Sequence, residues 1–380
     1  MAKKNRPKRF YDYSLLFCII FLMVFGLVMI YSASSYTAQL KFNNAGYFMM
    51  RQLTFALIGL GAALVISKVD YHWYARLYRF GYFISYVLMI AVSLVGREVN
   101  GKKRWLGVGS FSFQPTEVVK ITLIVYLAVL ITKMGSEIND WKKVMKVGLL
   151  RALPIAAIVG ANNLSSGIII VGIAFVMLFI ASRHKVLFYA GGIAAAVVVA
   201  VAGPLAILLE KIKVLKPYQL SRIHVWLSPE AYPMDGGYQV LQGLYAIGSG
   251  GLFGKGLGES IQKMGFVPEA QNDMIFSIIC EELGFVGAAI LVLVFLVLIW
   301  RFMVIAVHAP DLFGSLIAAG AMGHIAIQVI LNVAVVTNTI PNTGITLPFI
   351  SYGGTSVLFL LSEMGLVLAV SRWQSEKKCI

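Results

Sequence analysis

Long apolar runs alternate with short polar connectors along most of this chain. Apolar runs of about 17–25 residues have the length of a helix that crosses a membrane. We predict ten such spans, at Ser14–Ala33, Tyr47–Ile66, Phe80–Gly96, Phe113–Ile131, Val147–Gly160, Gly167–Ala181, Val186–Leu209, Met274–Trp300, Leu312–Val336 and Ser356–Val370. The pattern therefore predicts an all-α polytopic membrane protein with about ten transmembrane helices.

Composition agrees with this class. Of the 380 residues, 59% are hydrophobic and 13% are charged, and the mean hydropathy is +0.82. A soluble domain of this length does not need so much apolar surface. There is no internal repeat and no soluble segment large enough to fold alone, so we expect one membrane domain over residues 1–380.

The longest polar stretch covers residues 210–272, between the seventh and eighth predicted spans. We expect it to be a large extracellular loop. It contains Arg222, Lys255 and a glycine-rich run at residues 248–258, and it leads to the carboxylate of Asp273 at the start of the next span. Glycine-rich backbone can bring N–H groups close to an anion, but this run matches no nucleotide-binding fingerprint.

Lysine and arginine predict the orientation, because cytoplasmic segments carry most of them. With the N-terminus inside, ten spans leave both termini in the cytoplasm. Two basic clusters then lie outside against the usual bias: Arg97, Lys102, Lys103 and Arg104, and Lys211, Lys213, Lys216, Arg222, Lys255 and Lys263. Three explanations are open for these clusters. They could bind anionic lipid headgroups, they could simply be tolerated in a long loop, or they could bind an anionic ligand taken from the outer leaflet. Nucleic acid is a poor partner because the charge is spread over both faces.

The sequence allows two interpretations of Asp273. An aspartate at a helix start caps backbone N–H groups and suits the positive end of the helix dipole. A carboxylate half in lipid is also a candidate general base, because desolvation raises its pKa. Asn272 could cap equally well, so capping does not require Asp273. Both readings remain open from the residues alone.

Other charged residues fall within spans. Glu281 and Glu282 follow Asp273 on the same span, where Glu282 lies near the opposite helix face, so a structural partner is an alternative to a functional role. Glu117 and Lys120 have the i, i+3 spacing of an ion pair, which either fixes helix packing or bears on a ligand headgroup. Arg104 stands beside Trp105 and suits a phosphate or an interfacial anchor.

Two connectors are expected to be re-entrant or to line a cavity, at Asn100–Pro115 and Asn338–Gly354. Irregular backbone at membrane depth survives only where protein or water satisfies it. The five histidines form no Ser-His-Asp set and no zinc spacing, and the three cysteines have neither metal nor disulfide spacing.

Several ordered motifs resemble the SEDS family of RodA, FtsW and SpoVE. They are Asn100–Leu106, Phe113–Lys120, Tyr245–Gly251 with Gly254–Gly258, Asp273–Phe276 with Glu281–Gly284, and Pro341–Gly354. They span nearly the whole chain. Many family members read Gln-Pro-Asp-Leu-Gly-Thr after the fifth span, whereas this chain reads Asn162-Asn163-Leu164-Ser165-Ser166-Gly167. This departure favours an FtsW- or SpoVE-like branch.

The resemblance implies a peptidoglycan glycosyltransferase that polymerises lipid II outside the cytoplasmic membrane, for division or cell shape. It implies a class B penicillin-binding protein as partner, with other divisome or elongasome membrane proteins. The family's essential acid falls on Asp273, its fourth-span Glu and Lys on Glu117 and Lys120, and its extracellular Arg on Arg104. Further candidate substrate-binding residues, in the outer loop and the last motif, are Arg222, Lys255, Ser351 and Gly353.

The implied chemistry needs one carboxylate. The donor's α-linked undecaprenyl pyrophosphate and the β-1,4 product bond require a single inversion, with Asp273 as base on the acceptor 4-hydroxyl. Cations such as Arg104, Lys120 and Lys255, or a divalent ion (Mg²⁺ or Mn²⁺), would neutralise the leaving pyrophosphate. The sequence does not show a site for such an ion.

Two other function classes compete with the transferase. A lipid II flippase would suit glycine-rich spans and intramembrane charges, but a transporter places its site near the midplane with broken helices. A non-catalytic scaffold that recruits a penicillin-binding protein would not need Asp273.

Overall fold

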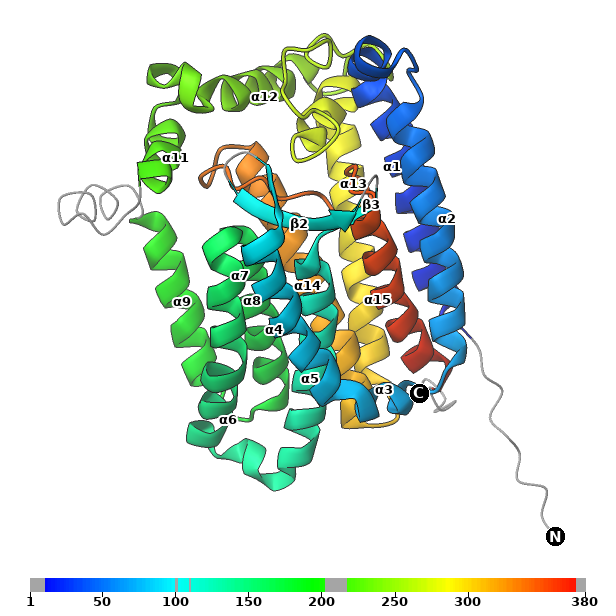
Figure 1. The fold of residues 1–380 in the computed structure, drawn as a ribbon, viewed down its shortest axis with the longest axis vertical. Coiled ribbons are helices and arrows are strands. Elements are labelled where there is room, and N and C mark those ends of the chain that lie inside the picture. Colours follow the sequence, from blue (N-terminus) through cyan, green and yellow to red (C-terminus); the bar gives the residue numbers. More distant parts are fainter. Residues whose placement is uncertain (1–10, 100–101, 109–110, 202–216, 374–380) are drawn as a thin grey trace.

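The computed structural model describes residues 11–99, 102–108, 111–201 and 217–373. These residues form a bundle of long helices with a small sheet and two further helices across one end (Figure 1). The expected class, an all-helical polytopic membrane protein, is confirmed.

Fourteen α-helices are described. They are α1 (Tyr13–Phe42), α2 (Tyr47–Lys68), α3 (Tyr71–Tyr74), α4 (Tyr78–Val95), α5 (Pro115–Met134), α6 (Trp141–Val147), α7 (Leu153–Asn162), α8 (Leu164–Ala181), α9 (Val186–Ala200), α11 (Pro217–Leu227), α12 (Gly237–Gly250), α13 (Ile275–Val307), α14 (Leu312–Val336) and α15 (Thr355–Arg372). Single turns of tighter or wider helix lie at Ala75–Leu77, Gly135–Asn139, Gly148–Ala152, Pro229–Ala231 and Pro233–Asp235.

Within the described residues, eight helical segments are long and apolar enough to cross a membrane. They are Tyr13–Phe42, Tyr47–Lys68, Tyr71–Val95, Trp141–Asn162, Leu164–Ala181, Ile275–Val307, Leu312–Val336 and Thr355–Arg372. The fourth and seventh predicted spans are not among these eight and correspond to α5 and α9. α5 has 20 residues and carries Glu117 and Lys120, and the described part of α9 has 15 residues. The predicted end of the seventh span lies outside the described residues.

Small residues let the central helices approach closely, as is typical inside membranes. A Cβ atom on Gly365 of α15 would lie 2.8 Å from the Cα atom of Ala63 on α2. Likewise, a Cβ atom on Gly59 of α2 would lie 3.0 Å from the Cα atom of Leu358. α14 and α15 are mostly buried, whereas α2 and α4 leave much of their apolar surface exposed to the surrounding lipid.

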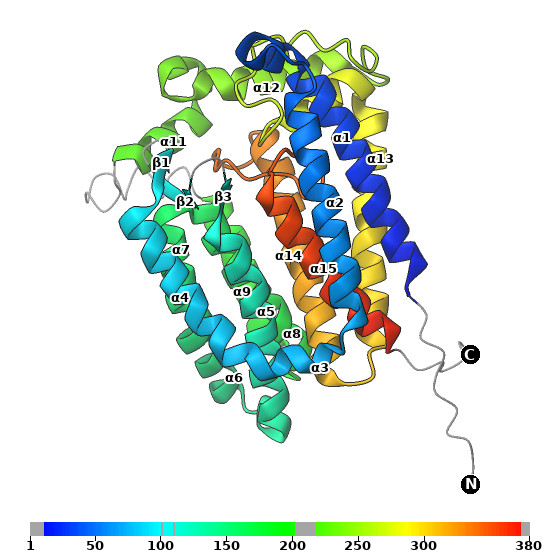
Figure 2. The same cartoon turned by 45° about the vertical axis from the view of Figure 1, so that its right-hand side comes forward.

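Both ends of the described chain lie at the same end of the bundle. The guanidinium of Arg372 lies 4.8 Å from the ring centroid of Tyr11, and the backbone N–H of Asp12 donates to Ser371 Oγ at 3.4 Å. Both ends therefore lie on the same side of a membrane crossed by this bundle. The segment that joins α1 to α2 is at the opposite end (Figure 2).

Three short strands join α4 to α5, and two of them lie within the predicted connector at residues 100–115. They are β1 (Arg97–Val99), β2 (Lys102–Val108) and β3 (Phe111–Phe113), and they pair antiparallel in the order β1-β2-β3. The register places Arg97 opposite Trp105, and Leu106 opposite Phe113. The sheet joins α4 to α5 and satisfies backbone groups that an irregular connector would leave unpaired.

The described part of the 210–272 segment is partly helical and lies across the end of the bundle away from the first and last described residues (Figure 1). α11 is tied to the connector after α14, because Trp226 Nε1 donates to the carbonyl of Asn338 at 3.0 Å. α12 lies against α13 so closely that a Cβ atom on Gly250 would lie 2.0 Å from the carbonyl oxygen of Cys280.

α13 is interrupted at Gly284, whose φ of 67° and ψ of −171° are accessible almost only to glycine. The backbone of residues 251–256 fills the break. Lys255 and Gly256 donate N–H bonds to the carbonyls of Glu281 and Glu282, both at 2.9 Å, and Phe285 donates to the carbonyl of Gly251. The N–H groups at 255 and 256 are therefore used within the protein and do not face an anion.

Candidate active site

A cavity of about 650 Å³ opens at the end of the bundle that carries α12. The sheet, α2, α5, α8, α11, α14 and the segment before α15 all contribute to its wall. Its polar lining residues include Arg51, Arg97, Arg104, Ser112, Gln114, Glu117, Lys120, Asn163, Ser165, Ser166, Arg222, Gln239, Glu269, Asn272, Asp273, Gln328, Asn342, Thr346, Tyr352, Thr355 and Ser356. The expectation that 100–115 and 338–354 line a cavity agrees with this arrangement.

Asp273 lies in the cavity wall, two residues before α13 begins. The N-cap position of α13 is Met274, whose side chain makes no capping hydrogen bond. Asp273 Oδ1 is buried and has no hydrogen-bond partner within the described parts of the chain. The capping interpretation of Asp273 is therefore wrong, and its carboxylate is available to a ligand in the cavity.

The position of Asp273 is fixed through its backbone. Asn332 Nδ2 of α14 donates to the carbonyl of Asp273 at 3.0 Å and to the carbonyl of Ile345 at 2.7 Å. A single buried amide thus holds the start of α13 against the connector after α14. Because Asp273 precedes Ile275, its carboxylate stands at the rim of the helix.

Burial raises the pKa of Asp273 to about 7. Its own backbone N–H lowers the pKa, the carboxylate of Glu269 raises it, and the cations of Arg222 and Arg104 lower it. A carboxyl group with a pKa near neutral is suited to accept a proton at physiological pH.

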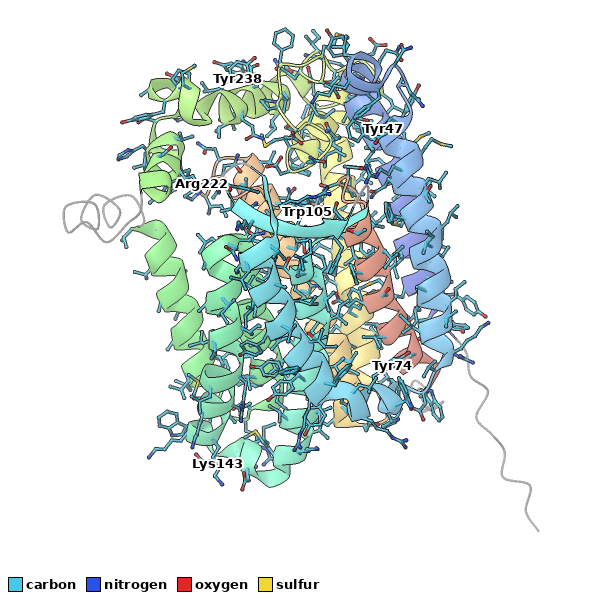
Figure 3. The ribbon with its side chains drawn as sticks, in the orientation of Figure 1. Tyr47, Tyr74, Trp105, Lys143, Arg222 and Tyr238 are labelled. Atoms are coloured by element: carbon cyan, nitrogen blue, oxygen red, sulfur yellow. The ribbon has the colours of Figure 1, made fainter. Side chains whose placement is uncertain are left out.

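Four arginines line the same cavity, Arg51, Arg97, Arg104 and Arg222. Arg104 Nε donates to the carbonyl of Asn162 at 3.2 Å, and Arg222 Nη1 donates to the carbonyl of Asn342 at 2.8 Å. Figure 3 shows Trp105 and Arg222 below α12, far from Lys143 at the opposite end. Held arginines of this kind recognise phosphate groups by paired hydrogen bonds.

Glu117 and Lys120 form an ion pair at the first turns of α5, with 2.9 Å between Lys120 Nζ and Glu117 Oε2. Lys120 is almost fully buried, and its ammonium group also donates to Gln328 Oε1 at 3.4 Å. Both residues line the cavity. The expected i, i+3 pair is confirmed, and it lies at the cavity wall rather than within a wholly apolar interface.

Of the other predicted substrate-binding residues, Gly353 lines the cavity, and its N–H donates to Gln52 Oε1 at 3.2 Å. Ser351 is buried and is not among the lining residues. Its hydroxyl accepts a bond from the N–H of Leu347 at 2.8 Å. The structure thus assigns Ser351 a contact within the connector.

Lys255 is also outside the cavity. Its ammonium pairs with Glu281 Oε1 at 2.7 Å, and Glu281 further accepts bonds from Ser260 Oγ and the N–H of Ile261. Lys263 pairs similarly with Glu282 at 2.8 Å. Both intramembrane glutamates therefore have structural partners, which corrects the expectation that Lys255 faces the leaving group.

Several lining residues are not among the sequence-based candidates, including Arg51, Gln328 and Asn163. Asn163 lies in the segment that departs from the family motif and caps α8 through Oδ1, which accepts from Ser166 N–H at 3.4 Å. The departure from the family motif at residues 162–167 could have pointed to Asn163 as a residue of the site. Arg51 and Gln328 lie within apolar spans, where nothing nearby in sequence points to the cavity.

No cluster of three or more His, Cys, Asp or Glu side chains is arranged to hold a metal ion within the described residues. A divalent cation at the site stays a prediction, and no step proposed below is routed through one.

The family model described as "Cell cycle protein", for FtsW, RodA and SpoVE, matches residues 13–376. Stage V sporulation protein E of Bacillus subtilis (strain 168) is 40% identical over 379 residues, covering 98% of this chain and 99% of the relative. "Probable peptidoglycan glycosyltransferase FtsW" of Trichlorobacter lovleyi is 37% identical over 368 residues, covering 95% and 93%. These similarities agree with the expected FtsW- or SpoVE-like branch.

Solved structures show the same fold. A chain from "Structural coordination of polymerization and crosslinking by a peptidoglycan synthase complex" has a TM-score of 0.77 and 27% identity, covering 96% of this chain and 99% of that chain. The rod shape determining protein RodA of Thermus thermophilus has a TM-score of 0.69 and 26% identity, covering 96% and 98%. The match across residues 13–376 and the shared fold establish that this chain belongs to the SEDS family of FtsW, RodA and SpoVE.

Proposed function

We propose that this protein is a peptidoglycan glycosyltransferase that polymerises lipid II at the cavity, on the outer face of the cytoplasmic membrane. The observation that carries the proposal is Asp273, whose Oδ1 has no hydrogen-bond partner among the described residues and which stands at the wall of a cavity lined by four arginines. The names of the FtsW relatives support this activity class.

In the proposed step, the 4-hydroxyl of the acceptor sugar attacks the anomeric carbon of the donor. The new C–O bond forms as the bond from that carbon to the pyrophosphate oxygen breaks, and the pyrophosphate leaves with the electron pair. Asp273 takes the hydroxyl proton. One displacement inverts the α-linked donor to a β-1,4 product, so a single base suffices, and such a base contributes roughly 100- to 10,000-fold.

Cations of the cavity would stabilise the departing pyrophosphate. Arg104 and Arg222 are held by backbone carbonyls, and Lys120 is held by Glu117 and Gln328. Because their positions are fixed before the reaction, they need little reorganisation as negative charge develops on the leaving group.

The proposal includes a class B penicillin-binding protein as partner, supported by the similarity to a chain from a peptidoglycan synthase complex. It treats residues 1–380 as one membrane domain, with segment 210–272 outside and both termini in the cytoplasm. Other divisome or elongasome membrane proteins are expected to assemble with it.

Lipid II polymerisation in detergent tests the proposed function. The purified protein, co-expressed with its penicillin-binding partner, should convert lipid II into glycan chains, whereas the partner alone should not. No chains from a verified complex would contradict the proposal. Transport of lipid II across vesicles by the same preparation would then favour a flippase, and neither activity would favour a scaffold.

A further inference from the structure

A chain of buried polar side chains runs from the cavity wall into the core of the bundle. It begins at Lys120 of α5, passes through Gln328 and His324 of α14, and ends at Glu363 of α15. Gln328 Oε1 lies 3.4 Å from Lys120 Nζ and 2.9 Å from His324 Nε2. His324 Nδ1 lies 2.8 Å and 3.0 Å from the two carboxylate oxygens of Glu363.

His324 and Glu363 are 1% and 2% exposed, so neither side chain reaches a ligand in the cavity. Burying two ionisable groups in a membrane helix bundle is costly unless they are paired. The family resemblance and the transferase chemistry assign no role to this pair, which therefore needs its own explanation.

The hydrogen-bonding partners of Gln328 determine the orientation of its side-chain amide. The Lys120 ammonium only donates hydrogen bonds, so the Gln328 atom that faces it must be the acceptor Oε1. Gln328 Nε2 accordingly donates to the carbonyl of Thr346 at 3.0 Å. His324 Nε2 faces the same Oε1 and must carry a proton.

The Glu363 carboxyl group completes the chain in either protonation state. Because Gln328 Oε1 requires a proton on Nε2, two arrangements fit: an ionised carboxyl group that accepts the Nδ1 proton of an imidazolium, or a protonated carboxyl group that donates to Nδ1 of a neutral ring. Without Glu363 the ring would lose its hydrogen-bond partner at Nδ1 and could turn away from Gln328, which would leave the Gln328 amide without its second support beside Lys120.

We propose that His324 and Glu363 are positioning residues, which hold Gln328 and through it the Lys120 ammonium at the cavity wall. Lys120 then presents its charge at one place toward the leaving pyrophosphate, while Glu117 holds the ammonium from its own helix. The kinetic part of the test rests on the proposed function, because it is read out as polymerisation of lipid II.

The first experiment compares His324→Leu with His324→Gln in the co-expressed complex. His324→Leu should lower the turnover rate at saturating lipid II about 10- to 100-fold, as expected for a displaced charged group. His324→Gln offers an amide N–H to Gln328 and should stay within about threefold of wild type. Ile325→Val, at the adjacent fully buried position, is the matched control and should leave the rate unchanged.

A double-mutant cycle separates positioning from simple support of the fold. When Lys120 is already Met, His324→Leu should change the remaining rate by less than about twofold. The same fold loss in both backgrounds, or a His324→Gln variant as poor as His324→Leu, would overturn the proposal. If His324→Leu does not fold, Glu363→Gln and Glu363→Leu replace it, with Glu363→Gln expected to stay near wild type and Glu363→Leu to lose activity.

A chemical readout keeps this inference apart from the proposed function. Acetylation of Lys120 by acetic anhydride, followed by mass spectrometry, should be severalfold faster in folded His324→Leu than in wild type, because the ammonium is less restrained. Equal rates in the two proteins would overturn the positioning role, whether or not glycan is made. A wild-type complex that makes no glycan would instead contradict only the proposed function.

Discussion

At the residue scale, the site combines a carboxylate of raised pKa with several restrained cations. The site residues Asp273, Arg104, Lys120 and Arg222 could be predicted from the sequence, because each lies in or near a motif or a polar segment. Lys255 and Ser351 were not placed correctly, since a motif does not tell which of its polar residues face inward. Gln328, His324 and Glu363 lie in apolar spans, and only the packing of α5, α14 and α15 brings them together.

The pH dependence of polymerisation follows from Asp273. A general base works in its ionised form, and burial raises the pKa of this carboxyl to about 7. The wild-type rate should therefore fall as the pH drops below about 7, approaching tenfold per pH unit. A pH–rate profile between about pH 5 and pH 8, with the complex shown intact throughout by size-exclusion chromatography, checks this. A rate independent of pH over that range would contradict the assignment.

Neighbouring cations on β2 allow a matched comparison. Arg104 lines the cavity, whereas the ammonium of Lys103 donates to the carbonyl of Leu94 and is not a lining residue. Arg104→Ala should lower kcat/KM for lipid II about 10- to 100-fold, while Lys103→Ala should change it less than about twofold. Equal losses would indicate a general effect of positive charge on substrate attraction rather than a contact made by Arg104.

At the element scale, the sequence predicts the helices well because their apolar runs are long. The second and ninth predicted spans match α2 and α14 closely, whereas the first begins with α1 but ends at Ala33, well before α1 ends at Phe42. It does not reveal the three-stranded sheet, whose strands are only three to seven residues long. It also does not reveal the break in α13, because glycine inside an apolar span usually indicates close helix packing. Only the tertiary fold shows that residues 251–256 supply the missing hydrogen bonds.

The break at Gly284 gives a stability prediction. A Cβ atom there would lie 2.3 Å from the backbone nitrogen of Gly254, in a backbone conformation that other residues rarely adopt. Gly284→Ala should destabilise the protein by about 3 kcal/mol or more. Gly61→Ala is the control, because no atom lies within 4 Å of its added Cβ. Thermal unfolding in detergent should show a lower midpoint for Gly284→Ala alone, and equal midpoints for both variants would contradict this account of the break.

At the scale of the whole molecule, the cavity opens at the end of the bundle away from the first and last described residues. Hydropathy and basic charge predicted the membrane class and an orientation, and the structure shows that the cavity and the first and last described residues occupy opposite ends. The cavity itself could not be predicted, because its wall is drawn from segments between Arg51 and Ser356 that are distant in sequence. Its chemistry depends on how those segments meet.

Cysteine labelling in intact cells tests the orientation. In a variant whose native cysteines are replaced, Met234→Cys stands 96% exposed at the cavity end, and Lys143→Cys stands at the other end on a half-exposed position. A membrane-impermeant maleimide should label the first and spare the second, with both labelled after cell lysis. The opposite pattern would place the cavity in the cytoplasm.

The central claim is that Asp273 is the base of a glycan-forming reaction, and one comparison tests it most directly. Lipid II polymerisation by the wild-type complex is measured beside that of Asp273→Asn, which keeps the size of the side chain but cannot take the proton. Wild type should form glycan chains, and a folded, partner-bound Asp273→Asn should be slower by at least about 100-fold. Equal chain formation by the two proteins would remove Asp273 from the mechanism.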